Sequence, residues 1–238
     1  MTAQPLQAVV FDFDGVLFDS EPLHQQALQA LGSALGYPVS DQAYHQTLIA
    51  FDDRDAMRWI AGRAGWTPEK AEAALPGWMR DKQLAVEDAV REYGVPAVPG
   101  ALELIVACRG SGLPIAIASG ATRRDIAAIL DKAGRSDAFD VVVTADDVAR
   151  SKPDPESYAR AVRKLAERFP DHDIAPAGCA AIEDTAGGAR SAVDAGLAVV
   201  GVTTTGPAEA LRAAGAVDVC DGPHQIDVER LVRAVAGR

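Results

Sequence analysis

The stretch Val9-Val10-Phe11-Asp12-Phe13-Asp14-Gly15-Val16-Leu17 places two carboxylates, one residue apart, at the end of an apolar run. A β-branched and aromatic run of this kind predicts a buried strand close to the N-terminus. Alternate residues of a strand face the same side, so Asp12 and Asp14 can converge on one small ligand. Two carboxylates at the end of a buried strand cost free energy unless cations or hydrogen bonds compensate them. Because Gly15 allows the chain to turn away sharply, this stretch predicts a reaction centre.

Apolar strand-like runs alternate with helical patterns through the second half of the chain. The runs that predict strands cover residues 114–119, 140–143, 178–182 and 198–202. The patterns that predict helices cover residues 101–109, 122–132 (with Thr122 as N-cap), 155–168, 188–195 and 207–214. This alternation predicts an α/β fold in which a parallel sheet carries helices on both faces. Ligands of such sheets bind at the carboxyl ends of the strands.

Residues 19–93 follow a different pattern, with helical periodicity and no convincing strand, and a segment rich in proline and glycine follows them at 93–100. We therefore expect an all-helical insertion over residues 19–93. The remaining residues, 1–18 and 94–238, would form one discontinuous α/β core.

Composition limits the classes of function. The 238-residue chain is 48% apolar, enough for a buried core, and carries a net charge of −11. An acidic chain does not predict binding to nucleic acid or to an anionic membrane surface. No apolar run approaches the roughly 20 residues of a membrane span, and the N-terminus has no secretory pattern. The three cysteines lack metal-site spacing and predict buried thiols in a reducing compartment, so we expect a soluble, monomeric, cytoplasmic protein.

Four short motifs, in order along the chain, resemble those of the haloacid dehalogenase-like superfamily. Residues 12–19 match motif I, which reads D-x-D-G-[TV]-L-x-D in the phosphatase members. Ser119-Gly120 matches motif II, where a hydroxyl and backbone N–H groups beside a helix N-terminus suit a phosphate. Lys152 matches motif III, and Glu183-Asp184 matches motif IV. The resemblance implies a Rossmann-like core with a helical cap domain formed by the insertion.

The resemblance also implies a role for each motif residue. Asp12 would be the nucleophile that forms an aspartyl-phosphate, and Asp14 would act as general acid and base. Lys152 would offset the charge of the phosphoryl group and of the carboxylates. Mg²⁺ would be held by Asp12, the backbone carbonyl of Asp14 and Asp184, with Glu183 as a further ligand or a partner of the ligands. Taken alone, Asp184 or Thr185 would more simply cap the helix that follows.

The helical insertion supplies further candidates for substrate binding. His24 lies twelve residues after Asp12, where it could face the catalytic carboxylates or simply pack on its helix. Arg54 lies where cap loops of sugar-phosphate enzymes of this superfamily place a substrate-binding arginine, but its acidic neighbours also suit a surface salt bridge. Arg80 and Lys82 could reach a substrate phosphate or decorate a helix surface.

The second aspartate of motif I favours phosphoryl transfer over dehalogenation, because a poor alkoxide leaving group needs a general acid and a halide does not. By resemblance, dehalogenases have no aspartate at the position of Asp14. We therefore predict a Mg²⁺-dependent phosphatase that acts on a small phosphorylated metabolite, a sugar or polyol phosphate. A β-phosphoglucomutase-type mutase is the alternative. A non-catalytic phospho-accepting or binding protein, similar to a receiver domain, is a minor one, because the D-x-D spacing and the insertion fit it poorly.

Overall fold

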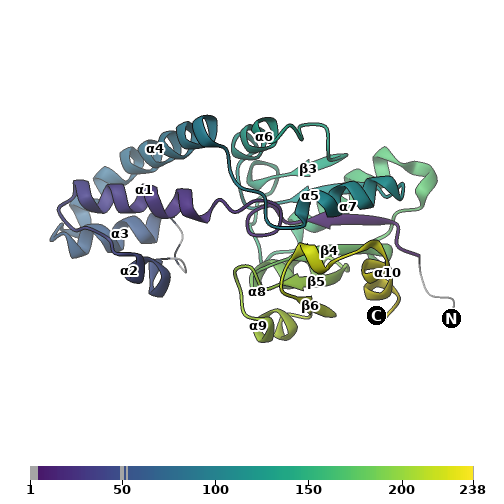
Figure 1. Cartoon of the computed structure of the whole chain (residues 1–238). Coiled ribbons are helices and arrows are strands. Elements are labelled where there is room, and N and C mark those ends of the chain that lie inside the picture. Colours follow the sequence, from purple (N-terminus) through teal and green to yellow (C-terminus); the bar gives the residue numbers. More distant parts are fainter. Residues whose placement is uncertain (1–4, 49–50, 52, 238) are drawn as a thin grey trace. The chain divides into compact units, whose positions relative to one another are not determined.

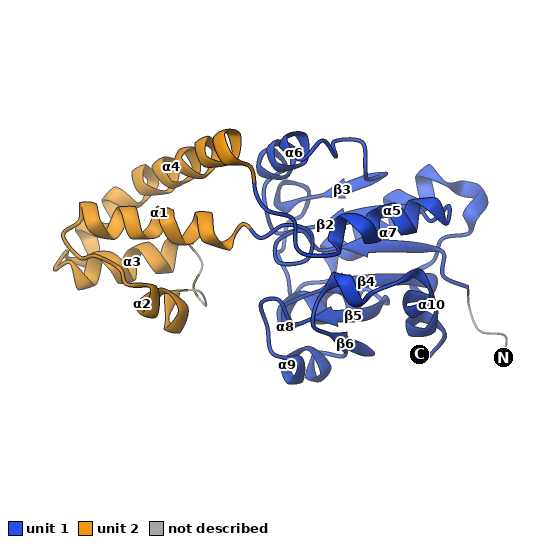
Figure 2. Ribbon diagram, in the orientation of Figure 1, with its two compact units in different colours: residues 1–19, 95–238 blue, residues 20–94 orange. Residues whose placement is uncertain are grey.

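The computed structural model describes residues 5–48, 51 and 53–237. Figure 1 shows the course of the chain, and Figure 2 shows that it divides into two compact units. The core unit comprises Met1–Asp19 and Val95–Arg238, and the helical unit comprises Ser20–Gly94. All strands of the described residues belong to the core unit.

The core unit is built on one six-stranded sheet in which every neighbouring pair is parallel. Its order is β3-β2-β1-β4-β5-β6. The strands are β1 (Ala8–Phe11), β2 (Ile115–Ala118), β3 (Val141–Val143), β4 (Cys179–Glu183), β5 (Ala198–Val202) and β6 (Asp218–Cys220). The strands β1, β2, β4 and β5 are buried throughout, because helices cover both faces of such a sheet. The predicted α/β fold is confirmed.

Six α-helices flank this sheet. They are α5 (Ala101–Gly110), α6 (Arg123–Lys132), α7 (Glu156–Arg168), α8 (Ala186–Asp194), α9 (Ala208–Ala213) and α10 (Val228–Ala236). Helix α7 packs on β1, β2 and β3 and touches α8, whereas α10 packs on β4 and β5 and touches α5. Right-handed crossovers between parallel strands place α7, α8 and α9 on one face and α5 and α6 on the other. The last helix, α10, follows β6 and contacts α5.

Local sequence signals fix the ends of several elements close to the sheet's carboxyl edge. The Thr122 side chain accepts a hydrogen bond from the Asp125 N–H at the start of α6, as predicted. The Thr185 side chain does the same for the Gly188 N–H at the start of α8. The strand predicted at 198–202 coincides with β5, whereas β6 and α10 were not predicted.

The helical unit contains α1 (Glu21–Ala34), α2 (Asp41–Gln46), α3 (Asp53–Arg63) and α4 (Pro68–Tyr93). Their apolar faces share a separate buried cluster, which includes Leu28, Tyr44, Met57 and Ile60. None of the helices in the described residues is long and apolar enough to span a membrane.

Candidate active site

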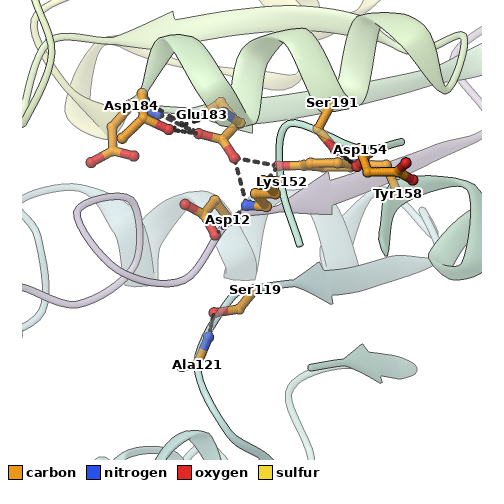
Figure 3. Close-up of polar contacts among 11 residues, drawn as sticks. Asp12, Ser119, Ala121, Lys152, Asp154, Tyr158, Glu183, Asp184 and Ser191 are labelled. Carbon is orange, nitrogen blue, oxygen red and sulfur yellow. Dashed lines mark hydrogen bonds and ion pairs between the residues drawn. The ribbon is translucent and has the colours of Figure 1, made fainter. Parts of the chain in front are cut away.

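The sheet brings three of the predicted motifs to one edge. Asp12 directly follows β1, whose central position makes β2 and β4 its two neighbours. Phe11 pairs in register with Ile117 of β2 and Ile182 of β4. The residues that follow these positions at the carboxyl ends of the strands therefore lie close together. Figure 3 shows Asp12, Ser119 and Glu183 at this edge, with Lys152 between Asp12 and Glu183.

Lys152 joins two of the carboxylates directly. Its Nζ donates to Asp12 Oδ1 at 2.7 Å and to Glu183 Oε1 at 2.6 Å. Only 15% of the Lys152 side chain is exposed, against 11% for Asp12 and none for Glu183. A residue of α8 holds the loop that carries Lys152 in place, because Ser191 Oγ donates to the Asp154 carbonyl at 2.6 Å. The lysine of motif III is thus held inside the acidic site.

Glu183 accepts hydrogen bonds on both carboxylate oxygens. Oε1 accepts from Lys152 and from the Tyr158 hydroxyl at 2.8 Å. Oε2 accepts from the backbone N–H groups of Asp184 and Thr185 and from the Thr185 hydroxyl. A Cβ atom at Gly188 would lie 1.9 Å from Oε1, so α8 can approach the carboxylate this closely only with glycine there.

Asp184 lies beside the turn of motif I. Gly15 has a φ of 74°, and a Cβ atom there would lie 1.9 Å from Asp184 Oδ2. The loop after β5 supports both residues: the Thr204 hydroxyl donates to the Gly15 carbonyl at 2.6 Å, and the Gly206 N–H donates to the Asp184 carbonyl at 2.9 Å. Gly15 therefore permits a turn and a close approach that a larger residue would prevent.

The site carries more negative than positive charge. Burial, with the neighbouring charge of Glu183, raises the pKa of Asp12 well above its usual value, and Lys152 only partly offsets this effect. Burial and Glu183 likewise raise the pKa of Asp184 to about 7. Burial disfavours the charged form of Lys152, but Asp12 and Glu183 outweigh it and raise the pKa of the ammonium group. Perturbed carboxylates of this kind are typical of functional sites.

The arrangement fits a divalent cation. Asp12, Glu183 and Asp184 each offer one carboxylate oxygen, and these oxygens lie within 4.8 Å of one another. Asp184 Oδ1 is buried and has no hydrogen-bond partner among the described residues. A buried carboxylate oxygen without a donor is costly, and hard oxygen ligands suit Mg²⁺. The orphaned oxygen and the surplus of negative charge are both consistent with a bound cation.

The three remaining core residues that the motifs predicted lie at or near the same edge. Ser119 follows β2 and is 2% exposed, and its Oγ accepts from the Ala121 N–H at 3.0 Å. Gly120, next to it, is exposed. Asp14 is partly buried in the turn after β1. Their predicted contacts with a phosphate or a leaving group stay predictions.

The candidates from the insertion lie in the helical unit. Lys82 is 7% exposed, and its Nζ donates to Asp53 Oδ1 at 2.5 Å and lies 2.8 Å from His24 Nδ1. The alternative that Lys82 decorates a helix surface is therefore wrong, because partners from α1 and α3 hold it inside. Arg54 and Arg80 are exposed. Substrate binding by His24 and Arg54 stays a prediction.

Tyr158 and Thr204 make polar contacts in the site, although the sequence analysis did not single them out. The Thr204 contact could have been anticipated, because the predicted strand 198–202 ends just before it and ligands collect at such ends. Tyr158 gives no comparable signal, since a tyrosine on the apolar face of a helix usually packs in the core.

Comparisons with known proteins agree with the fold and the site. The family model of haloacid dehalogenase-like hydrolases matches residues 6–196. Protein CbbY of Rhodobacter capsulatus is 32% identical over 82% of this chain and 84% of its own length. Validoxylamine A 7'-phosphate phosphatase of Streptomyces hygroscopicus subsp. limoneus is 31% identical over 87% of this chain and 91% of its own length.

A solved structure agrees as well. It is that of a CbbY variant from Rhodobacter sphaeroides in complex with xylulose-1,5-bisphosphate. It aligns with a TM-score of 0.73 at 25% identity and covers 95% of this chain and 99% of that one.

Proposed function

Because the chain belongs to the haloacid dehalogenase-like hydrolase family, we propose that it is a Mg²⁺-dependent phosphatase that hydrolyses a small sugar or polyol phosphate. The observation that carries this proposal is the buried contact of Asp12 with Lys152 inside a cluster of three carboxylates. A carboxylate nucleophile needs a nearby cation to approach a phosphate dianion, and Lys152 supplies one at 2.7 Å.

The reaction has two displacement steps. In the first, a carboxylate oxygen of Asp12 attacks phosphorus while the bond to the substrate oxygen breaks, and Asp14 gives its proton to the leaving alkoxide. In the second, Asp14 takes a proton from water as the water oxygen attacks the phosphorus of the aspartyl-phosphate. This step releases inorganic phosphate and restores Asp12. Lys152 stabilises the negative charge that gathers on the phosphoryl oxygens in both steps.

The cation would be held by Asp12, Asp184 and the backbone carbonyl of Asp14, with Glu183 beside them. When bound, it would supply positive charge that keeps Asp12 ionised and offsets the charge of the phosphate. Ser119 and the backbone N–H groups that follow it would bind the phosphoryl oxygens, since they lie at the adjoining strand end just ahead of α6.

The substrate class rests on the relatives. One is a phosphatase of validoxylamine A 7'-phosphate, and another is a protein solved with xylulose-1,5-bisphosphate, and both names indicate a phosphorylated carbohydrate or a similar small metabolite. By resemblance, we also propose that the helical unit is a cap domain that supplies His24 and Arg54 as substrate contacts, and that the enzyme acts as a cytoplasmic monomer.

The test is phosphate release from sugar, polyol and nucleotide monophosphates with Mg²⁺, with Asp12→Asn as the blank. β-Glucose 1-phosphate belongs in this panel, with glucose 6-phosphate formation followed in parallel and a bisphosphate primer present. Steady phosphate release that the blank lacks supports a phosphatase. Isomerisation with little release would support the mutase instead, and inactivity in both assays would refute the enzymatic proposal.

A further inference from the structure

Tyr158 carries a buried hydroxyl group that the proposed mechanism does not use. The residue lies in α7, is 0% exposed, and donates its O–H to Glu183 Oε1 at 2.8 Å. Its ring belongs to the apolar cluster that α7 forms against the sheet, together with Ala161, Val162 and Leu165. These residues follow Tyr158 at spacings of three, four and seven, which define one helix face. A phenylalanine would fill the same apolar space, so packing does not require the hydroxyl.

The hydroxyl shares its acceptor with the lysine of the site. Glu183 Oε1 accepts from Tyr158 and, at 2.6 Å, from Lys152 Nζ. Lys152 Nζ also donates to the Tyr158 hydroxyl at 3.5 Å and lies 5.0 Å from the centre of the Tyr158 ring. Figure 3 shows the tyrosine and the lysine converging on Glu183, with Asp12 on the other side of the ammonium group.

Glu183 cannot easily turn away from these donors. Its second oxygen, Oε2, accepts from the backbone of Asp184 and from the backbone and hydroxyl of Thr185. Because the carboxylate is fixed, Tyr158 and Lys152 donate to the same oxygen, Oε1, and each offsets part of its negative charge. A hydrogen bond from the phenol reduces the attraction that Oε1 exerts on the ammonium group, since the donor already offsets part of the negative charge.

We propose that Tyr158 is a positioning residue that sets how the Lys152 ammonium group is shared between the carboxylates of Glu183 and Asp12. Its hydroxyl takes up part of the charge of Glu183, so the ammonium group keeps its hydrogen bond to Asp12, where the phosphoryl group is transferred. This inference rests on the proposed function, because it assigns Tyr158 a part in the same site. Without the hydroxyl, Lys152 would shift toward Glu183 and would stabilise the transferred group less.

The variant that tests this is Tyr158→Phe, which removes one oxygen atom and keeps the ring. Because hydrogen bonds to charged groups contribute more than neutral ones, we expect kcat to fall about 10-fold. We expect KM for the best substrate to stay within about two-fold, because the lost contact acts on charge that develops during transfer. An unchanged kcat would overturn the proposal.

Tyr44→Phe is the matched control. Tyr44 is 2% exposed and donates its O–H to Glu21 Oε1 at 2.5 Å within the helical unit. Tyr44→Phe therefore also removes a tyrosine–glutamate hydrogen bond, one that is partly buried and belongs to the helical unit. We expect both variants to lower the unfolding temperature by similar amounts and only Tyr158→Phe to lower kcat. Equal losses of kcat would assign the effect to general destabilisation and overturn the proposal.

A second background separates action through Lys152 from a direct effect. In Lys152→Ala, adding Tyr158→Phe should not reduce the residual turnover further, because the group that the tyrosine positions is gone. The same fold-loss in both backgrounds would contradict the positioning role. Wild-type turnover, measured alongside, tests the proposed function separately: an inactive wild type refutes both proposals, whereas an active wild type with a fully active Tyr158→Phe refutes only this one.

Discussion

Among the described residues, each unit holds a largely buried lysine beside a carboxylate, and the two arrangements differ in their charge balance. In the core unit, Lys152 lies between Asp12 and Glu183, whose side chains are 11% and 0% exposed. In the helical unit, Lys82 is buried to a greater degree, with 6% of its side chain exposed, but pairs with Asp53, which is 41% exposed. Lys152 thus contacts two buried carboxylates, whereas Lys82 contacts one carboxylate that is exposed to solvent.

The difference favours Lys152 as the lysine of the proposed reaction centre. A single partner, with His24 as a further contact, balances the charge of Lys82. Near Lys152 a third carboxylate, Asp184, leaves the cluster negative, and burial together with the charge of Glu183 raises the pKa values of Asp12 and Asp184. A stable protein gains nothing from surplus buried charge, so such a surplus is consistent with a bound cation.

Replacing Asp12 should have the largest effect of all. Asp12→Asn keeps the size of the side chain and removes the nucleophile, so we expect phosphate release to fall by at least about 10³-fold. The measurement is initial velocity on the best substrate of the panel, with circular dichroism to show that the variant is folded. Substantial remaining turnover would remove Asp12 as the nucleophile.

Replacing the two lysines tests the comparison itself. We expect Lys152→Met to lower kcat by about 10²- to 10³-fold, since a preorganised cation at the transferred group is lost. For Lys82→Met we expect a loss of about 1–3 kcal/mol in the free energy of unfolding, because Asp53 and His24 lose their shared partner. Urea unfolding and steady-state kinetics measure both. The contrast fails if Lys152→Met retains wild-type kcat or if Lys82→Met unfolds at the same urea concentration as wild type.

Removing the metal should abolish activity and make the stability of the folded protein depend on the ionisation of Asp184. We expect EDTA to abolish phosphate release and Mg²⁺ to restore it. The pKa of Asp184 is raised to about 7 in the folded protein, so in the metal-free protein the folded state binds more protons than the unfolded state between about pH 4 and 7. The contribution of Asp184 to stability therefore falls as the pH rises through this window.

The unfolding temperature measures this effect directly. Added Mg²⁺ should raise it more at about pH 8, where Asp184 is ionised, than at about pH 5, where a proton occupies the carboxylate. A shift that is equal at both values, or absent, would contradict the assignment of Asp184 as a metal ligand.

Replacing Arg54, which is exposed in the helical unit, should have the smallest effect. If Arg54 contacts the substrate, Arg54→Ala should raise KM by about 5-fold and leave kcat within two-fold, since exposed charge contacts contribute at most about 1 kcal/mol. Arg91→Ala is the control, because Arg91 is an exposed arginine paired with Asp88. Unchanged kinetics for Arg54→Ala would show that Arg54 does not contact the substrate.

The parts of the fold that could be predicted are those with a strong local signal. The apolar run of β1 ending in Asp12 and Asp14, and the cap of α6 by Thr122, depend on neighbouring residues only. The strand β6 (Asp218–Cys220) escaped prediction because it is three residues long and contains a charged residue. Its pairing with β5 depends on the rest of the sheet.

The site was predictable as a set of motifs but not as a network. Motif order predicts that Asp12, Lys152 and Glu183 meet, whereas the hydrogen bond from Tyr158 depends on how α7 packs on the sheet. Lys82 illustrates the same limit: its burial comes from partners on α1 and α3 that lie 58 and 29 residues away in the sequence. Contacts of this kind are fixed by the packing of distant segments, which a local sequence pattern cannot predict.

The most direct test of the central claim is to trap the covalent intermediate. Enzyme mixed with Mg²⁺ and its best substrate is quenched in acid within the first turnover, digested, and analysed by mass spectrometry. We predict that one phosphoryl group is found on the peptide that contains Asp12, and that Asp12→Asn shows none. A phosphoryl group on another residue, or turnover that continues in Asp12→Asn, would contradict the assignment of the core unit's acidic cluster as the reaction centre.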